Sequence, residues 1–252
     1  MGAEGRSDVT GIRKRLLETA KALQSALLDL LYPKDVCCLC CDRAVAPDAQ
    51  DGLCDDCLAA LDTLGAQPQA IDPAPGIVRA AAAFPYTGQA RRLIIRLKYE
   101  RLREAAVPLA RAMAMLPGGE TDVLVPVPTT KKRLRKRGYN QAQVLAALVA
   151  QETGMPVTEA LVRTEERAEQ VRLSGQSRRQ NLQGTMTADH QVRGKRVLLI
   201  DDVYTTGSTA AEAARALLAA GAVSVEVFTA AKSVYGEKPG AGQSRAERAP
   251  FR

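Results

Sequence analysis

The stretch Val197-Leu198-Leu199-Ile200-Asp201-Asp202-Val203-Tyr204-Thr205-Thr206-Gly207-Ser208-Thr209-Ala210 decides the fold of this chain. Its four leading apolar residues predict a strand buried on both faces. The two acids that follow would lie at the carboxyl end of that strand, where open α/β sheets bind ligands. The small residues after them allow backbone N–H groups to converge on a phosphate where a helix begins. Because the acids would repel that phosphate, we expect them to face sugar hydroxyls or Mg²⁺.

Segments typical of strands and of helices alternate on both sides of this turn. The expected strands are 77–84, 121–127, 195–200 and 223–230, and the expected helices start near 89, 140 and 209. Such alternation is typical of an α/β fold with a doubly wound, mostly parallel sheet. A further helix is expected at 12–31, where apolar residues recur at helical spacing.

All six cysteines lie between positions 37 and 57. Two C-x-x-C pairs about a dozen residues apart can supply four thiolates to one tetrahedral Zn²⁺, and the short arm between them is too small to form a core. The first pair is ambiguous in the sequence, because Cys37/Cys40 and Cys38/Cys41 have the same spacing. We prefer Cys37 and Cys40, together with Cys54 and Cys57, as ligands of a structural zinc. The alternatives are packed reduced cysteines or a redox pair.

The composition limits the class of protein. The chain has 252 residues, a formal charge of +7, 46% hydrophobic residues and no Trp. This apolar fraction excludes global disorder, and no apolar stretch approaches the ~20 residues of a membrane-spanning helix. The N-terminal segment has no apolar region typical of a signal peptide. We therefore expect a cytoplasmic protein without stable membrane insertion.

The segment quoted first resembles the phosphoribosyl pyrophosphate (PRPP) binding motif of type I phosphoribosyltransferases. The resemblance implies that Asp201 and Asp202 hold the ribose hydroxyls, with Mg²⁺ bridging PRPP oxygens. The residues implied to cradle the 5-phosphate are Thr205, Thr206, Gly207, Ser208 and Thr209. Tyr204 stands where the family usually has an aliphatic residue, which bears on packing rather than on phosphate contact.

Further motifs narrow the resemblance. They are Tyr86-Thr87-Gly88, Leu97-Lys98-Tyr99, Arg137-Gly138-Tyr139-Asn140-Gln141-Ala142, and the spaced residues Arg163, Gln170, Arg178, Asn181 and Leu182. With the cysteine ribbon upstream, they resemble the ComF-type competence proteins. Apolar spacing and composition predict an N-terminal helix at 1–34, a linker at 63–76 rich in Pro, Gln and Ala, and a disordered tail at 233–252. The resemblance implies a zinc ribbon at 35–62 and a phosphoribosyltransferase-like domain at 77–232.

The basic run from Lys131 to Arg137 follows an expected strand end, so it would lie at the ligand edge of the sheet. PRPP is a dense polyanion, and neutralising its leaving group is the main electrostatic task of such a site. The residues expected to contact pyrophosphate or nucleic acid are Lys131, Lys132, Arg137, Arg163 and Arg178. The alternative for the run is a solvated helix end. The polar stretch that contains Arg163 and Arg178 is either a lid over the substrate or a surface loop.

The resemblance implies a role in natural transformation, with PRPP, single-stranded DNA and a helicase-like ATPase as partners. Transfer of a phosphoribosyl group would have an acceptor that the sequence does not reveal. The alternatives are a non-catalytic, PRPP-regulated DNA-binding factor and a nucleotide-salvage phosphoribosyltransferase. A regulator of purine genes would normally carry a helix-turn-helix, and none is found. Few aromatic residues are present to stack on bases, which argues against pure DNA binding, and Tyr139 in the basic loop is the best-placed candidate. The single histidine, His190, is expected to be structural or on the surface.

Overall fold

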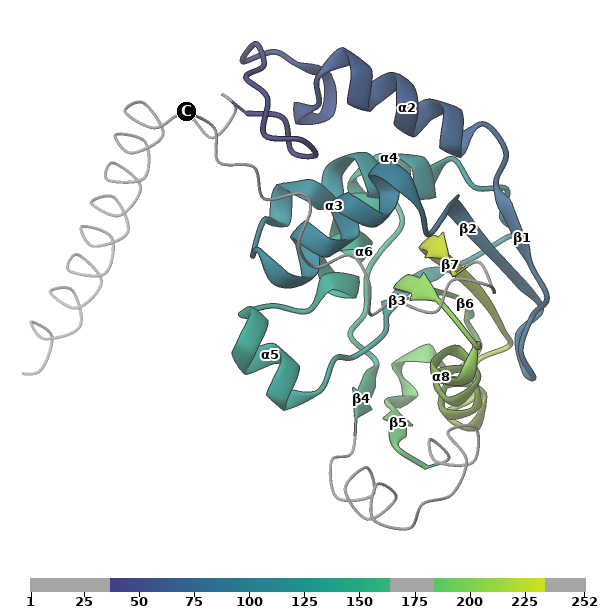
Figure 1. Cartoon of the computed structure of the whole chain (residues 1–252). Coiled ribbons are helices and arrows are strands. Elements are labelled where there is room, and N and C mark those ends of the chain that lie inside the picture. The colour runs from purple at the N-terminus through teal and green to yellow at the C-terminus, as the bar shows by residue number, and fades with distance from the viewer. Residues whose placement is uncertain (1–36, 164–183, 234–252) are drawn as a thin grey trace, which may run out of the picture. The chain divides into compact units, whose positions relative to one another are not determined.

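The computed structural model describes residues 37–163 and 184–233 (Figure 1). The chain divides into two compact units, Met1–Asp55 and Asp56–Arg252. The expected N-terminal helix, nearly all of the expected tail and every residue of the spaced motif after Arg163 lie outside the described residues. Within the described ranges, no helix combines the length and the apolar character that a membrane span requires.

The second unit is built on a five-stranded sheet with the order β1-β2-β7-β6-β3. The strands are β1 (Gln69–Ile71), β2 (Arg79–Pro85), β3 (Val123–Pro126), β6 (Arg196–Tyr204) and β7 (Ser224–Lys232). All neighbours pair in parallel except β1, which is antiparallel to β2 at the edge. β6, the strand of the quoted segment, therefore lies between β7 and β3, where both of its faces can be covered.

Helices cover both faces of this sheet (Figure 1). They are α3 (Gly88–Tyr99), α4 (Ala106–Ala114), α6 (Gln141–Thr153) and α8 (Ser208–Ala219). Two more helices are α2 (Asp55–Gly65), which precedes β1 in the chain, and the short α5 (Lys131–Arg137), which precedes α6. Val197 and Leu199 belong to the core cluster that includes the apolar side of α8. Leu198 lies with residues of α4 and α6. The structure confirms the expected doubly wound, mostly parallel sheet and the strand buried on both faces.

A two-stranded antiparallel sheet lies apart from the main one. It pairs β4 (Leu161–Arg163) with β5 (Met186–Ala188). The buried Glu212 of α8 accepts a hydrogen bond from the Met186 backbone N–H at 3.1 Å. Arg215, also on α8, donates to the Met186 carbonyl at 3.3 Å. These contacts fix the small sheet to the helix and so position the end of β4. Three short 3-10 helices complete the described elements: η1 (Gln50–Gly52), η2 (Arg103–Ala105) and η3 (His190–Val192).

The segment 63–76 is not the bare linker that we expected. α2 continues to Gly65, and Gln69–Ile71 forms the edge strand β1. Ile71 is buried against the core cluster, which explains why so short a segment pairs with the sheet. Its Pro and Gln content suits an edge strand, where unpaired backbone groups face solvent.

Candidate functional site

The carboxyl end of β6 brings Asp201 and Asp202 to a cavity of about 490 Å³, called here the acid cavity. Four cationic side chains line the same cavity, and they come from α3, α5 and β4: Lys98, Arg133, Arg137 and Arg163. Because parallel strands end at one edge of the sheet, the loop after β3 reaches this edge as well. The Val127 N–H donates to the Ile200 carbonyl at 2.9 Å and fixes that loop beside the acids.

The two acids have different surroundings. Asp202 forms an ion pair with Lys98, with 2.8 Å between Oδ1 and Nζ. Asp201 is enclosed, and its Oδ1 accepts a hydrogen bond from the Asp202 backbone N–H at 2.8 Å. Burial, and then repulsion from Asp202, raise the pKa of Asp201 to about 7, against the smaller opposing effects of that hydrogen bond, Lys98 and Arg163. The pair can therefore hold one proton near neutral pH.

Two donors inside the cavity have no partner within the described part of the chain. They are Arg163 Nε and Gln141 Nε2. Gln141 is 2% exposed, and its Oε1 already accepts a hydrogen bond from Arg137 at 2.8 Å. Burial, and then the charge of Arg133, lower the pKa of the Arg163 guanidinium. Buried donors without partners are costly, and the two residues that carry these donors line the acid cavity.

The small-residue turn separates two cavities. Thr205 and Thr209 line the acid cavity, whereas Thr206, Gly207 and Ser208 line a second cavity of about 920 Å³ beside α8, which Thr205 also reaches. We expected the acids and the whole turn to face one crevice, and the structure brings only the two ends of the turn to the acids. The reason is the tight bend at Gly207, which turns the middle of the segment toward β1.

Gly207 is required at this bend for two reasons. Its φ is 74°, which a side chain would strain. A Cβ there would also clash with the Tyr204 hydroxyl. Tyr204 is buried in the core cluster, and its ring packs beneath the turn on the side of the core. This agrees with the expectation that Tyr204 affects packing rather than phosphate contact. Gly207 is the N-cap of α8 and offers no side chain to the first amides of that helix.

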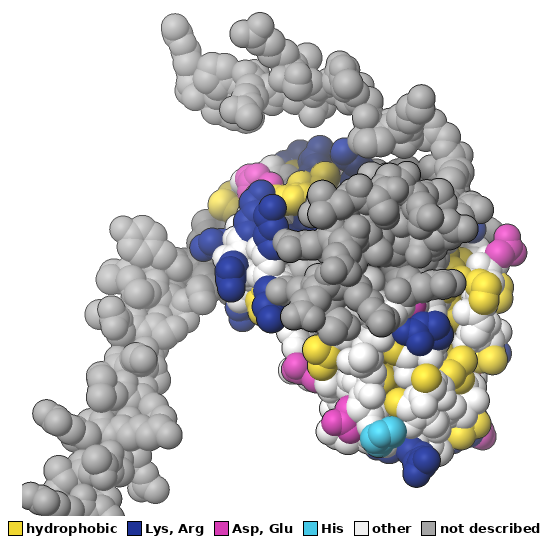
Figure 2. Space-filling model, turned by 90° about the horizontal axis from the view of Figure 1, so that it is seen from below, with side chains coloured by type: hydrophobic (Ala, Val, Ile, Leu, Met, Phe, Trp, Pro, Cys, Tyr) yellow, Lys and Arg dark blue, Asp and Glu magenta, His cyan; other side chains and the backbone are white. Residues whose placement is uncertain are grey.

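The basic helix α5 contributes a different set of residues from the one we predicted. Arg133 and Arg137 line the acid cavity, but Lys131 and Lys132 do not. No residue of α5 is buried, and Lys and Arg side chains gather on this side of the molecule (Figure 2). Arg163 lines the cavity as expected. Arg178 lies outside the described residues.

The expectation that Tyr139 stacks on bases is wrong. Tyr139 is buried, its hydroxyl donates to the Leu97 carbonyl at 2.6 Å, and Arg103 lies over its ring at 4.6 Å. Tyr99, at the end of α3, is instead 65% exposed and lines the acid cavity. The Arg137 guanidinium lies 5.3 Å from the centre of its ring.

Sequence reasoning assigned no role to several polar residues of the cavity, among them Lys98, Arg133 and Gln141. Lys98 and Gln141 lie in motifs that carried the family resemblance, but no role had been assigned to either. Arg133 belongs to the basic run and differs from its neighbours only in its position on α5. His190 is exposed at the start of η3, which agrees with a surface role.

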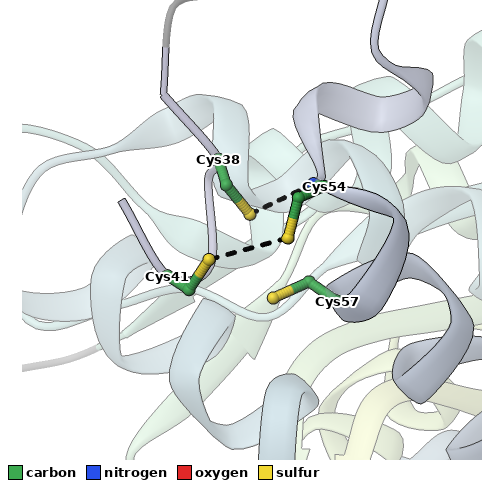
Figure 3. A group of neighbouring side chains, drawn as sticks. All are labelled: Cys38, Cys41, Cys54 and Cys57. Carbon is green, nitrogen blue, oxygen red and sulfur yellow. Dashed lines mark hydrogen bonds between the residues drawn. The ribbon is translucent and has the colours of Figure 1, made fainter. Parts of the chain in front are cut away.

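Four cysteines come together near the N-terminal end of the described chain: Cys38, Cys41, Cys54 and Cys57 (Figure 3). Their sulfur atoms all lie within 4.8 Å of one another. Cys41 and Cys54 are 3.6 Å apart, which is too long for a disulfide and close to the ~3.8 Å edge of a tetrahedron with metal–sulfur bonds of about 2.3 Å. The four sulfurs therefore fit one tetrahedral metal ion.

The structure corrects the preferred register of the first cysteine pair. The backbone of Cys37 forms an isolated β-bridge with Ala44 and its side chain is exposed. Since side chains alternate along extended backbone, the next residue, Cys38, points inward. Burial raises the pKa of the Cys38 thiol, but hydrogen bonds from the backbone N–H groups of Cys54, Cys40 and Cys41 outweigh it, and the pKa falls to about 7. Cys40 is buried but is not one of the four.

Comparisons with known proteins show which family this chain resembles. The model of the phosphoribosyl transferase domain matches residues 134–243. The DNA utilization protein YhgH of Escherichia coli O157:H7 is 32% identical over 201 residues, which cover 76% of this chain and 88% of that protein. Competence protein ComFC of Bacillus subtilis is 36% identical over 120 residues, or 44% of this chain and 45% of the relative. Among solved structures, the glutamine PRPP amidotransferase of B. subtilis is 26% identical, with a TM-score of 0.37. The match covers 53% of this chain and 26% of the amidotransferase chain.

Proposed function

Because the chain belongs to the ComF-type family of proteins with a type I phosphoribosyltransferase fold, we propose that it binds Mg²⁺-PRPP in the acid cavity and acts on single-stranded DNA during natural transformation. The observation that carries the proposal is the meeting of Asp201 and Asp202 with four cationic side chains in one cavity. The names of the relatives, a DNA utilization protein and a competence protein, support the DNA part of the proposal.

The acid pair suits the hydroxyls of a ribose. A carboxylate accepts hydrogen bonds from hydroxyl groups, and charge-assisted bonds of this kind are about twice as strong as neutral ones. Because the pKa of Asp201 is about 7 without ligand, donation by a ribose hydroxyl would favour its charged form and release a proton. Both carboxylates would then orient the sugar and stabilise the positive charge that develops at its anomeric carbon.

The cations suit the pyrophosphate group. Arg133, Arg137 and Arg163 approach the cavity from α5 and β4, whereas Lys98 is engaged by Asp202. Arginine offers planar, multiple donors that match phosphate oxygens. The unpartnered Arg163 Nε is the donor that gains most from an incoming oxygen.

The cavity has the oxygen donors that Mg²⁺ prefers. Asp201 and Asp202 would hold the ion together with oxygens of the ligand, and the bound ion would neutralise the charge of the leaving pyrophosphate.

We also propose that four cysteines hold a structural Zn²⁺, because four thiolates complete its tetrahedral coordination. They are Cys38, Cys41, Cys54 and Cys57. Family membership further leads us to propose a cytoplasmic site of action and a helicase-like ATPase as partner.

Titration calorimetry with Mg²⁺-PRPP tests the proposal. The double variant Asp201→Asn/Asp202→Asn should bind at least about 100-fold more weakly than the wild type, because two charge-assisted hydrogen bonds of roughly 1.5–3 kcal/mol each are weakened. Asp72→Asn is the matched control, since Asp72 lines the second cavity, and its affinity should equal that of the wild type. Equal affinities for the double variant and the wild type would reject the acid cavity as the PRPP site.

A second measurement separates a transferase from a PRPP-regulated DNA-binding factor. The wild type is incubated with Mg²⁺-PRPP and either single-stranded DNA, nucleosides or free bases, and pyrophosphate is measured. A transferase releases pyrophosphate with at least one acceptor, whereas a binding factor releases it with none. The double variant is the control for contaminating activity.

A further inference from the structure

The short helix α5 presents two faces with different surroundings. Arg133 and Arg137 are four residues apart, so they share one face of the helix, and both line the acid cavity. Lys132 and Lys136 are also four residues apart, and neither lines the acid cavity or the second cavity. Both lysines are exposed, and no acidic side chain of the described residues pairs with either. One face of α5 therefore belongs to the cavity, and the other presents cations to solvent.

The loop between α3 and η2 extends the outer face of α5. Arg101 donates from Nη2 to the Lys136 carbonyl at 3.2 Å, which brings it to the carboxyl end of α5. Arg103 lies over the Tyr139 ring, 4.6 Å from its centre. Both arginines are exposed, as is Arg135 of α5. These cations together form what we call the outer basic surface: Arg101, Arg103, Lys132, Arg135 and Lys136.

The backbone at Arg101 carries strain. Its φ is 60°, in the left-handed region that residues other than glycine rarely adopt. Such conformations cost free energy and are often found at binding sites. Of the two acids in this loop, Glu100 pairs with Arg96 at 3.0 Å, and Glu104 is exposed. A guanidinium is thus held beside a run of like charges, and an anionic partner would offset that cost.

We propose that the outer basic surface binds the phosphate backbone of single-stranded DNA, whereas the inner face of α5 serves the acid cavity. The inference rests on the proposed function, because it takes the DNA strand from there, and it adds the surface that holds the strand. Since both faces belong to one short helix, a strand on the outer face lies beside the cavity. The two faces also assign different residues to the two anions that the basic run was expected to contact.

The chemistry of the surface favours a nucleic acid strand over a lipid membrane. A helix that lies in a membrane interface needs an apolar face opposite its charged face. α5 has one apolar side chain, Leu134, which is 43% exposed. Cations without an apolar face suit a chain of closely spaced phosphates, because neutralising them releases condensed counterions and favours binding.

The test measures how the affinity for single-stranded DNA depends on salt. A labelled fifteen-residue oligothymidylate is titrated with the full-length protein at several salt concentrations, and binding is followed by fluorescence anisotropy. Each phosphate contact to a single strand contributes about 0.7 to the slope of log affinity against log salt. Lys132→Gln/Lys136→Gln should therefore flatten the slope by about 1.4 and weaken binding about 25-fold at roughly 0.1 M salt. Arg101→Gly removes one cation and relieves the strained backbone, so it should flatten the slope by about 0.7.

A matched double variant removes the same charge from the opposite end of the sheet. Arg193 and Lys195 precede β6, whereas the acid pair lies at its carboxyl end, and neither residue lines either cavity. Arg193→Gln/Lys195→Gln should bind the strand as the wild type does. The Mg²⁺-PRPP affinity of both double variants should stay within about twofold of the wild type, because both leave the cavity lining unchanged and salt screens exposed charges.

The outcomes separate the surface from the proposed function. An equal loss in the two double variants, or no loss in Lys132→Gln/Lys136→Gln, overturns the surface and leaves DNA binding intact. A matching loss of Mg²⁺-PRPP affinity in Lys132→Gln/Lys136→Gln overturns the division of α5 into two faces.

Failure of the wild type to bind the strand overturns the DNA part of the proposed function and the outer basic surface with it. Vesicles of phosphatidylglycerol and phosphatidylcholine are the second probe. If they retain the wild type but not Lys132→Gln/Lys136→Gln, and the strand binds both proteins equally, the partner of the surface is a lipid membrane and the inference is wrong.

Discussion

Replacing Asp201 by asparagine is expected to stabilise the folded protein at neutral pH while it weakens PRPP binding. The carboxyl of Asp201 is enclosed and lies beside Asp202, and these two effects raise its pKa from an ordinary 3.8 to about 7. Asparagine has nearly the same shape and keeps an oxygen that can accept from the Asp202 N–H. It therefore imitates the protonated acid and removes the cost of burying a charge.

The sign of the pH dependence follows from the raised pKa. The folded state binds the proton more tightly than the unfolded chain, so the contribution of Asp201 to stability falls as the pH rises from the unfolded pKa to the folded one. Each pKa unit corresponds to about 1.4 kcal/mol, so the full cost above neutral pH is roughly 4 kcal/mol. Between about pH 5.5 and about pH 8.5, the advantage of Asp201→Asn should grow by about 2 kcal/mol and then level off.

Urea unfolding, followed by far-UV circular dichroism at several pH values, measures this advantage directly. Both proteins are unfolded under identical conditions, so contributions that they share, including those of the cysteine cluster, cancel in the difference. Met115→Ala is the control, because it changes an exposed residue without changing charge; its difference from wild type should not vary with pH. A difference for Asp201→Asn that stays constant over this range would refute the assignment of a shared proton to the acid pair.

Two other predictions follow from single contacts. Tyr139→Phe should lower the free energy of unfolding by about 1–2 kcal/mol in urea, because the Leu97 carbonyl loses its buried donor, and single-strand affinity should not change; a loss of affinity at unchanged stability would contradict the buried placement. Metal analysis should find about one zinc per wild-type chain and per Cys37→Ser chain but less in Cys38→Ser, and the reverse pattern would restore the register first preferred from the sequence.

The central part of the fold could be predicted because its signals are local. Four apolar residues, two acids and a glycine turn before a helix follow one another in the chain, and β6 and α8 form where this order requires. Gly207 carries the signal most directly, since its positive φ and the close approach of Tyr204 exclude a side chain there. The neighbouring strands and helices were predicted for the same reason, by their own hydrophobic periods.

The edge strand β1 and the register of the first cysteine pair could not be predicted in this way, because both depend on contacts with distant residues. β1 has three residues and a Pro-rich context, and it is a strand because Ile71 finds a place in the core. The two candidate registers of the first cysteine pair have identical spacing. The bridge between Cys37 and Ala44 selects one of them by turning Cys38 inward. Neither contact has a signature within a short window of sequence.

The residues of the acid cavity illustrate the same limit. Lys98, Arg133 and Gln141 come from three helices. Their near neighbours Arg96, Lys132 and Gln143 have similar chemistry but do not line the cavity. Helix phase alone distinguishes Arg133 from Lys132, and it is fixed by where α5 begins, after the Thr130 cap. Tyr139 was assigned wrongly for a related reason, because its hydroxyl donates to the Leu97 carbonyl inside the fold, a contact between distant parts of the chain.

The acid cavity is arranged for binding at the expense of stability. Asp201 is half-buried beside a second acid, Arg163 is half-buried near another arginine, and two donors lack partners within the described part of the chain. Each of these features destabilises the empty site, and strongly perturbed groups of this kind are typical of functional sites. A ligand with hydroxyls for the acids and anionic oxygens for the arginines would offset both kinds of cost at once. The expected gain in stability of Asp201→Asn and its expected loss of PRPP affinity therefore have the same physical origin.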